Sequence, residues 1–281
     1  IAKIAFTGET STGRLIMQYA SQNLIPVTLE LGGKSPAIVA PGYPLATAVG
    51  RIAAGKWLNA GQTCIAPDYV LVPRADVDAF VAQMREYVAR SYPQLAATSD
   101  FSSVASERQH QRLVRLLDEA RATGAQVIEL GVGDAAKRVL PPTLVLGARD
   151  DIGLMRDEIF GPVLPVIGVD SVDAAIEYVN ARPRPLALYH FDHDRARTER
   201  VLERTIAGGV SVNDTVMHIA QSELPFGGVG PSGMGHYHGH QGFLTFSKQK
   251  PVLYQARFSS LKMMRPPYGR LADFLLKFLT R

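Results

Sequence analysis

The chain has 281 residues, of which 46% are hydrophobic and 20% charged, and its formal net charge is +4 at pH 7. This length is enough for about two domains, and the composition is ordinary for a globular protein. The basic residues are spread out rather than run together, so the charge does not indicate a nucleic-acid partner. No apolar stretch approaches the roughly 18 residues of a membrane span, which argues against an integral membrane protein. The single cysteine excludes an internal disulfide framework and is typical of a reducing compartment, so we expect a cytoplasmic location.

The first residues, IAKIAFTGETSTG, have no initial methionine and open directly on a strand-like apolar run. They are too short and become polar too soon for a signal peptide. We therefore expect the sequence to be the C-terminal fragment of a longer chain that was cut in its middle.

Apolar residues recur with two different periods along the chain, and these periods predict alternating strands and helices. Strands are expected at residues 4–6, 26–31, 37–40, 69–72, 126–130, 143–146, 186–191 and 209–212. Helices are expected around residues 15–19, 113–120 and 271–279, and over 45–58, 76–88, 171–180 and 195–205. This alternation predicts an α/β fold with a mostly parallel sheet.

Residues 225–243, PFGGVGPSGMGHYHGHQGF, are rich in glycine and are expected to form a long irregular loop. A loop of that length in a compact domain is usually functional. Residues 245–254, which follow it, are expected to form an edge strand.

Gly8 and Gly13 bound the turn within the stretch FTGETSTGRL, which has the strand, turn and helix order of an anion-binding site. Free N–H groups at the start of a helix bind phosphate, so a phosphate-binding turn is one interpretation. Arg14 and Leu15 occupy the places where a Walker A loop needs Lys and Ser or Thr, and the spacing is not G-x-G-x-x-G. A purely structural turn is an equal alternative.

Glu30 lies in VTLELGGKSP, between two leucines and before two glycines, at the end of an apolar predicted strand. Burial at that place would raise the pKa of its carboxyl group toward the range of a general base. The alternative is a strand-end glutamate that pairs with Lys34 in water.

Cys64 lies in NAGQTCIAPDYV, a few residues after a predicted helix. The residues before it are polar and turn-forming, so we expect the thiol in a loop where it faces a cleft. The alternative is inert core packing, the commonest state of a lone buried cysteine. A pair with one of the seven histidines has no local sequence support.

The stretch DEIFGPVLPV could offer Glu158 to a sugar hydroxyl and Phe160 as a wall for a flat ring. The alternative is a loop that leads into a strand. Three alternating histidines, His236, His238 and His240, lack an obvious fourth ligand and a fixed scaffold, so no metal site is expected.

Taken together, the ordered set FTGETSTG, LELGGKSP, NAGQTCIAPDYV, DEIFGPVLPV and PFGGVGPSGMG resembles the aldehyde dehydrogenase superfamily. Within it, CIAPDYVLVP, VNDT, GMGHYHGHQGFLTFS and the RPPY tail resemble the class 3 branch, which includes fatty and coniferyl aldehyde dehydrogenases. The resemblance runs from about Ile4 to the final predicted helix. It implies oxidation of an aldehyde to a carboxylic acid, with NAD or NADP as cofactor.

The resemblance implies separate duties for two residues. Cys64 matches the nucleophile, whose thiolate attacks the aldehyde carbon to give a thiohemiacetal, and loss of hydride to the nicotinamide then leaves a thioester. Glu30 matches the general base, which deprotonates the water that hydrolyses this thioester.

A cofactor site is also implied by the resemblance. Its expected members are Gly8 and Gly13 at the pyrophosphate, Leu31 and Gly32 beside the nicotinamide, Glu158 on its ribose and Phe160 beside its ring. Phe226 is expected to line the substrate passage. Glu9 stands where many family members have a small polar residue, and its carboxylate would repel pyrophosphate unless it points away.

By the same resemblance, residues 1–32 are the remnant of a Rossmann-like NAD(P)-binding domain. Residues 33–214 form an aldehyde dehydrogenase-like catalytic domain with a parallel-rich sheet flanked by helices, and residues 215–281 form a C-terminal segment. Residues 245–254 are expected to join a partner subunit's sheet in a homodimer. The longer N-terminal segment of family members, with its oxyanion-stabilising asparagine, is expected to be missing.

Three alternatives remain open on the sequence. The chain is a folded fragment without activity, or an acylating dehydrogenase that passes its thioester to coenzyme A, or a thiol hydrolase that needs no nicotinamide. Glu30 argues against the acylating enzyme, because a general base for water is what such an enzyme would avoid.

Overall fold

A computed structural model describes residues 2–259 and 266–280 of the chain. The chain divides into two compact units, Ile1–Phe246 and Ser247–Arg281. The first unit contains both β-sheets. It includes the predicted segments 1–32 and 33–214 and the first part of the predicted segment 215–281. The second unit contains helix α9 (Arg270–Leu279).

Strands and helices alternate along the first unit, as the periodicity predicts. Its strands are β1 (Ile4–Thr7), β2 (Val27–Glu30), β3 (Pro36–Val39), β4 (Tyr69–Pro73), β5 (Gln126–Glu129), β6 (Thr143–Leu146), β7 (Val163–Val169), β8 (Ala187–Phe191), β9 (Gly209–Val212) and β10 (Gly233–Met234). Its α-helices are α1 (Thr10–Ser21), α2 (Leu45–Trp57), α3 (Val77–Ser91), α4 (Glu107–Ala122), α5 (Gly153–Arg156), α6 (Val172–Asn180), α7 (Arg195–Arg204) and α8 (Gly239–Thr245).

The larger sheet has the strand order β5-β6-β7-β4-β3-β8-β9. Its neighbouring strands are parallel except at the edge, where β5 runs antiparallel to β6. Every residue of β3 and β8 is buried, which explains why PAIV and ALYHF read as apolar runs rather than as alternating patterns. The predicted α/β fold with a parallel-rich sheet is confirmed.

Helices cover both faces of this sheet, and side chains of opposite strand faces enter separate cores. Ile52 of α2 and Phe80 of α3 pack with Val39 on one face. Ile176 of α6 packs with Ile38 on the other face. The buried side chains of α4 form a third core with β6 and the start of β7.

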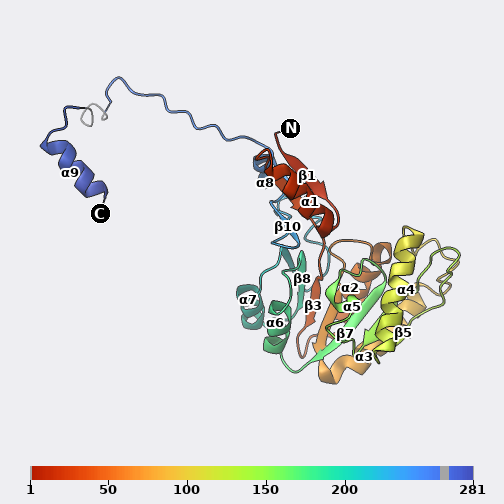
Figure 1. Cartoon of the computed structure of the whole chain (residues 1–281). Helices are drawn as coiled ribbons and strands as arrows, with labels where there is room; N and C mark the ends of the chain where they lie inside the picture. The colour runs from red at the N-terminus through yellow and green to blue at the C-terminus, as the bar shows by residue number, and fades with distance from the viewer. Residues whose placement is uncertain (1, 260–265, 281) are drawn as a thin grey trace. The chain divides into compact units, whose positions relative to one another are not determined.

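The smaller sheet has the order β1-β2-β10, with β1 parallel and β10 antiparallel to β2. In Figure 1, β1, α1, β10 and α8 gather at one end of the first unit, and the larger sheet with its helices occupies the other. Helix α1 buries only Gly13 and Ala20, whereas Leu15 and Tyr19 are exposed. Residues 31–35 connect β2 of this sheet directly to β3 of the larger one.

The glycine-rich segment 225–243 is less irregular than expected, because it contributes β10 and most of α8. Left-handed backbone at His238 (φ 86°) and Gly239 (φ 50°) turns the chain just before α8. The edge strand expected at residues 245–254 is not present within this chain: Thr245 ends α8, and residues 248–256 belong to no helix or strand. A strand needs a pairing neighbour, and local patterning does not supply one.

Helix α9 of the second unit is amphipathic, with Leu271, Phe274 and Phe278 exposed. Over residues 2–259 and 266–280, no helix combines the length and the hydropathy that crossing a membrane requires.

Candidate active site

A cleft of about 1680 Å³ is lined by residues of both sheets of the first unit. The larger sheet contributes loops that precede its strands: Gly33 comes before β3, Cys64 before β4, Glu158 before β7 and Arg184 before β8. The cleft therefore lies at the amino ends of these parallel strands. Open α/β sheets more often bind ligands at the opposite, carboxyl edge.

The backbone before Cys64 is strained in a way that shapes the loop. Asn59, Ala60 and Gly61 all have left-handed φ values, 49°, 52° and 74°. Such a run is costly for residues with a side chain and occurs mainly at functional sites. A Cβ atom on Gly61 would lie 2.2 Å from the carbonyl oxygen of Gly161, so the loop packs directly on the backbone that follows Phe160.

Gln62 anchors the same loop and was not singled out from the sequence. Its amide nitrogen donates to the carbonyl oxygens of Asn59 and Ser103, both at 3.0 Å. Its amide oxygen accepts from the backbone N–H of Ala105 at 2.8 Å. Through these three hydrogen bonds, Gln62 fixes the loop before Cys64 to the segment of Ser103 and Ala105. This segment is distant in sequence, so only the tertiary structure identifies it as the partner.

Cys64 lies in a loop and lines the cleft, as its polar neighbours predict. Burial raises the pKa of its thiol to about 11, with further contributions from the negative charges of Glu158 and Glu30. The backbone N–H groups of Cys64 and Ile65 oppose this rise by hydrogen bonding to the sulfur. The thiol is thus held protonated and lies within electrostatic reach of two carboxyl groups.

Glu30 ends β2, lines the same cleft and is only 5% exposed. Neither of its carboxylate oxygens has a hydrogen-bond partner among the described residues. Burial raises the pKa of this carboxyl group to about 8. The alternative pairing with Lys34 is wrong, because Lys34 forms an ion pair with Asp68 instead.

Glu158 packs against the backbone that follows Glu30. A Cβ atom on Gly32 would lie 1.7 Å from Oε2 of Glu158, so only glycine leaves room for this carboxyl group. Burial is the main reason that the pKa of Glu158 rises to about 8, and the charge of Asp68 adds to it, while the Gly33 N–H bond opposes it. Phe160 lines the cleft with a left-handed φ of 46° and is 40% exposed.

The glycines of FTGETSTGRL have different environments. Gly8 lies in the loop after β1 and lines the cleft, and its N–H donates to the carbonyl oxygen of Glu30 at 3.0 Å. Gly13 lies inside the first turns of α1 and packs on the buried side chain of Leu31, which itself lines the cleft. Glu9 is the N-cap of α1, but its side chain makes no capping hydrogen bond. The first N–H groups of α1 are thus not capped by a side chain at the edge of the cleft.

Phe226 is buried and does not belong to the cleft lining. Its backbone pairs with Tyr237, and its ring lies against the rings of His218 and His238. Phe226 thus belongs to the hydrophobic core of the first unit and not to the lining of the cleft, where the substrate passage was expected. Within the described parts of the chain, no group of three or more His, Cys, Asp or Glu side chains is placed to hold a metal ion.

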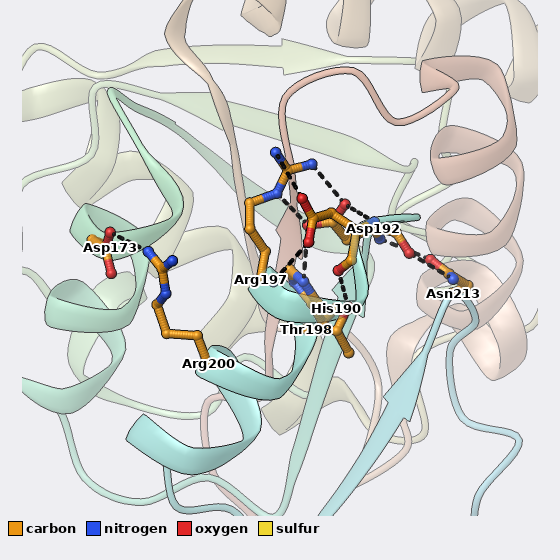
Figure 2. Close-up of polar contacts among 8 residues, drawn as sticks. Asp173, His190, Asp192, Arg197, Thr198, Arg200 and Asn213 are labelled. Carbon is orange, nitrogen blue, oxygen red and sulfur yellow. Dashed lines mark hydrogen bonds and ion pairs between the residues drawn. The ribbon is translucent and has the colours of Figure 1, made fainter.

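Asn213 of the VNDT motif lies far from these residues, at the carboxyl end of the larger sheet. Figure 2 shows it beside Asp192, which follows β8. The Asn213 side chain accepts from the Asp192 N–H and donates to the Asp192 carbonyl oxygen, both at 2.8 Å. Arg197 donates to both carboxylate oxygens of Asp192, at 2.7 and 2.8 Å, and His190 lies 3.5 Å from one of them. This Asp192 cluster (His190, Asp192, Arg197 and Asn213) closes the turn after β8.

Comparisons with known proteins agree with this arrangement. The family model described as "Aldehyde dehydrogenase family" matches residues 1–252. A curated protein of Pseudomonas aeruginosa, named "Probable coniferyl aldehyde dehydrogenase", is 54% identical over 267 residues, which cover 95% of this chain and 56% of that protein. The chain thus spans little more than half the length of this relative.

Solved structures show the same similarity in three dimensions. The substrate-bound state of AldH from Staphylococcus aureus matches with a TM-score of 0.90 and 39% identity, over 99% of this chain and 60% of that chain. Betaine aldehyde dehydrogenase from the same organism, in complex with NAD+, matches with a TM-score of 0.79 and 28% identity, over 86% of this chain and 50% of that chain. With the family model covering most of its length, the chain belongs to the aldehyde dehydrogenase family.

Proposed function

We propose that this chain carries the nucleophile and the general base of an NAD(P)-dependent aldehyde dehydrogenase, Cys64 and Glu30. The observation that carries the proposal is that a thiol and a buried, unpartnered carboxyl group line one cleft, where the charge of Glu30 contributes to the raised pKa of the Cys64 thiol. Since the chain spans 56% of the Pseudomonas aeruginosa relative, the activity is proposed for the full-length protein that contains it.

The chemistry divides between the two residues. The Cys64 thiol first gives up its proton to water. The thiolate sulfur then bonds to the aldehyde carbon and gives a thiohemiacetal, whose oxyanion needs hydrogen-bond donors. Loss of hydride from that carbon leaves a thioester on Cys64, and the nicotinamide cofactor, when bound, supplies the hydride acceptor. Glu30 takes a proton from water, the resulting hydroxide adds to the thioester, and the carboxylic acid leaves as the thiolate re-forms. A carboxyl group without partners, with a pKa of about 8, is suited to this proton transfer.

The residues along the cleft fit a dinucleotide. The N-terminus of α1 offers N–H groups that no side chain caps, beside Gly8, and such N–H groups bind phosphate. Glu158 and Phe160 both line the cleft, which supports a role for Glu158 as acceptor of ribose hydrogen bonds and for the partly exposed Phe160 ring beside the nicotinamide. Leu31 and Gly32 would contact the nicotinamide. Glu9 is exposed at the same edge, which allows its carboxylate to turn toward water.

For the substrate, the name of the Pseudomonas aeruginosa relative supports an aromatic aldehyde of the coniferyl aldehyde type. An acylating enzyme that uses coenzyme A is disfavoured by Glu30, because a buried base beside the thioester promotes attack by water. Product analysis with and without coenzyme A separates the two outcomes: free acid in both cases supports the proposal, and an acyl-coenzyme A product contradicts it.

The test uses the full-length protein with coniferyl aldehyde and either NAD+ or NADP+. Cys64→Ala is expected to abolish NADH or NADPH formation and also the hydrolysis of an activated ester, since both need the thiol. Glu30→Gln is expected to retain a first burst of reduced cofactor and then to turn over slowly, because hydride transfer precedes the step that needs the base. Normal turnover of Cys64→Ala, or equal slowing of both phases in Glu30→Gln, would remove these residues from the mechanism.

Titration of NAD+ against residues 1–281 alone answers a separate question. Measurable binding shows that this chain supplies enough of the cofactor site by itself. No binding supports the alternative of a folded but inactive chain and assigns the remaining contacts to the rest of the protein.

A further inference from the structure

The Glu158 segment, residues 157–159, is held by charged side chains that take no part in the proposed chemical steps. Lys34 donates from Nζ to the carbonyl oxygen of Asp157 at 3.0 Å, and to that of Leu154 at 2.8 Å just before the segment. Lys34 also forms an ion pair with Asp68, whose other carboxylate oxygen accepts from the N–H of Ile159 at 3.0 Å. The ion pair is almost completely buried, with 9% and 4% of the two side chains exposed.

A third side chain, Arg112 of α4, also holds the Glu158 segment. Its guanidinium donates to the carbonyl oxygen of Glu158 at 3.2 Å and to that of Ile159. Its Nε donates to the side-chain oxygen of Gln109 at 2.7 Å, which fixes the fork of the guanidinium. The carbonyl groups of all three residues of the segment, and the N–H of Ile159, therefore bond to charged side chains.

The positions of these side chains connect the three reactive segments. Lys34 follows Glu30 by four residues, and Asp68 follows Cys64 by four residues. The ion pair between them joins the segment of the base to the segment of the nucleophile, and the Asp68 N–H adds a bond of 2.7 Å to the Ser35 carbonyl oxygen. Through the bonds to residues 157–159, the same pair also fixes the segment that carries Glu158.

The environment favours a rigid arrangement. Asp68 is 3% exposed, and the hydrogen bonds are charge-assisted, which makes them stronger than bonds between neutral groups. Movement of a loop that is hydrogen-bonded to buried, charged side chains leaves those side chains without partners. The free-energy cost is much larger than for a loop that is hydrogen-bonded to water. A rigid support of this kind is what keeps a binding group within the small tolerance that hydride transfer requires.

We propose that Lys34, Asp68 and Arg112 are positioning residues that hold the Glu158 carboxyl group at a fixed place relative to Cys64 and Glu30, and thereby set the position of the nicotinamide ribose. This inference rests on the proposed function for the identity of the ligand. The rigidity of the Glu158 segment is a property of the chain itself and is tested without cofactor.

Arg112→Met is the most informative variant, because it removes the donors, keeps most of the side-chain volume and leaves the Lys34–Asp68 pair intact. In the full-length protein we expect the KM for NAD(P)+ to rise about 10- to 100-fold, the effect of a displaced positioning contact. Hydrolysis of an activated ester by Cys64 in the absence of cofactor should stay at the wild-type rate. Arg112→Lys retains one donor and should restore part of the affinity.

Arg121→Met is the matched control, since Arg121 lies on the same helix and makes only exposed ion pairs with Asp118 and Glu129. This variant should keep the wild-type KM. A rise in KM equal to that of Arg112→Met would mean that any loss of positive charge on α4 weakens binding, and would overturn the proposal.

A second measurement separates positioning through Glu158 from a direct contact with the cofactor. In a Glu158→Ala background, Arg112→Met should change the KM little, because both substitutions remove the same interaction. If the two effects multiply, Arg112 contacts the ligand itself, and the proposal is wrong.

Amide hydrogen exchange of the 281-residue chain provides a readout that needs no activity. The Ile159 N–H, protected by Asp68, should exchange faster in Arg112→Met than in wild type, while amides of β3 and β8 keep their protection. Unchanged exchange would overturn the proposal. If exchange rises as expected but Cys64→Ala remains active, the proposed function is wrong, whereas the inference that Arg112 holds the Glu158 segment remains supported.

Discussion

The cleft and the Asp192 cluster each contain a buried carboxyl group, but the two groups differ in their hydrogen-bond partners and their pKa values are shifted in opposite directions. Glu30 is 5% exposed, has no hydrogen-bond partner among the described residues, and has a pKa raised to about 8. Asp192 is 3% exposed and accepts from Arg197 and from the Asp194 N–H. Burial also opposes ionisation of Asp192, but these hydrogen bonds and the charge of Arg197 outweigh it and lower its pKa.

This difference shows how hydrogen-bond partners distinguish a carboxyl group that stabilises the fold from one that can take part in a reaction, when both are equally buried. A carboxylate with all its partners stabilises a turn and has no free capacity for a proton. A buried carboxyl group without partners destabilises the folded state. Such groups occur mainly at functional sites, where a reaction needs their shifted pKa. The two groups therefore predict opposite responses to substitution.

The largest effect is expected at Asp192. Asp192→Ala leaves the Arg197 guanidinium and the Asp194 N–H without their acceptor, which should lower the free energy of unfolding by about 3 kcal/mol. Urea denaturation measures this change. Asp170→Ala is the control, because its ion pair with Arg74 is exposed to solvent and should contribute little to the free energy of unfolding. Equal losses for the two variants would end the distinction drawn above.

Gly32→Ala comes next and acts on the cleft. The added Cβ atom collides with the Glu158 carboxyl group, which must leave its place against the backbone. We expect the KM for NAD(P)+ of the full-length protein to rise about 10- to 100-fold, with ester hydrolysis by Cys64 little changed. Gly124→Ala serves as a substitution control away from the cleft, because nothing lies within 4 Å of its added Cβ, although its φ of +89° costs some stability. Wild-type cofactor affinity in Gly32→Ala would contradict the packing of Glu158.

A smaller effect concerns the pH dependence of stability at Glu30. The pKa of its carboxyl group is about 8 in the folded chain and near 4.5 when unfolded, so the folded state binds the proton more tightly. Its contribution to stability is therefore most favourable below pH 4.5 and is lost progressively as the pH rises to about 8. Glu30→Gln should match wild type near pH 4.5 and be the more stable of the two near pH 8, as chemical denaturation at the two pH values would show. A constant difference across this range would show that Glu30 does not titrate as described.

The smallest effect is expected on the reactivity of Cys64. The negative charge of Glu158 helps to raise the pKa of the thiol to about 11. Glu158→Gln removes that charge, so the thiolate fraction and the rate of alkylation by iodoacetamide near pH 9 should increase a few-fold. Because the chain has one cysteine, the labelled fraction reports this thiol alone. A slower reaction in the variant would place the two groups out of electrostatic reach.

Much of the larger sheet could be predicted because its signals are local. The buried runs of β3, β4 and β8 are continuous and apolar, and Ser171 caps α6 with a bond to the Ala174 N–H, as its place in the sequence indicates. Thr143–Leu146 and Gly209–Val212 have the predicted bounds. The placement of Cys64 in a loop also follows from its neighbours.

The rest depends on partners distant in sequence. The alternative interpretation of Glu30 was a pair with Lys34, four residues away, but Lys34 pairs with Asp68, which leaves Glu30 without a partner among the described residues. The role of Gln62 depends on Ser103 and Ala105. Helix α8 begins after a left-handed turn that the glycine content suggests but does not locate. Ion-pair partners and turn positions of this kind are determined by the tertiary fold. The periodicity of apolar residues along the sequence does not predict them.

The antiparallel pairing of Glu30 with Gly233 has a consequence for how the protein is made. While a ribosome synthesises the roughly two hundred residues between them, one edge of β2 stays open, whereas its pairing with β1 is local. Open strand edges invite pairing with other chains, so slow elongation in this stretch should favour aggregation of nascent polypeptides.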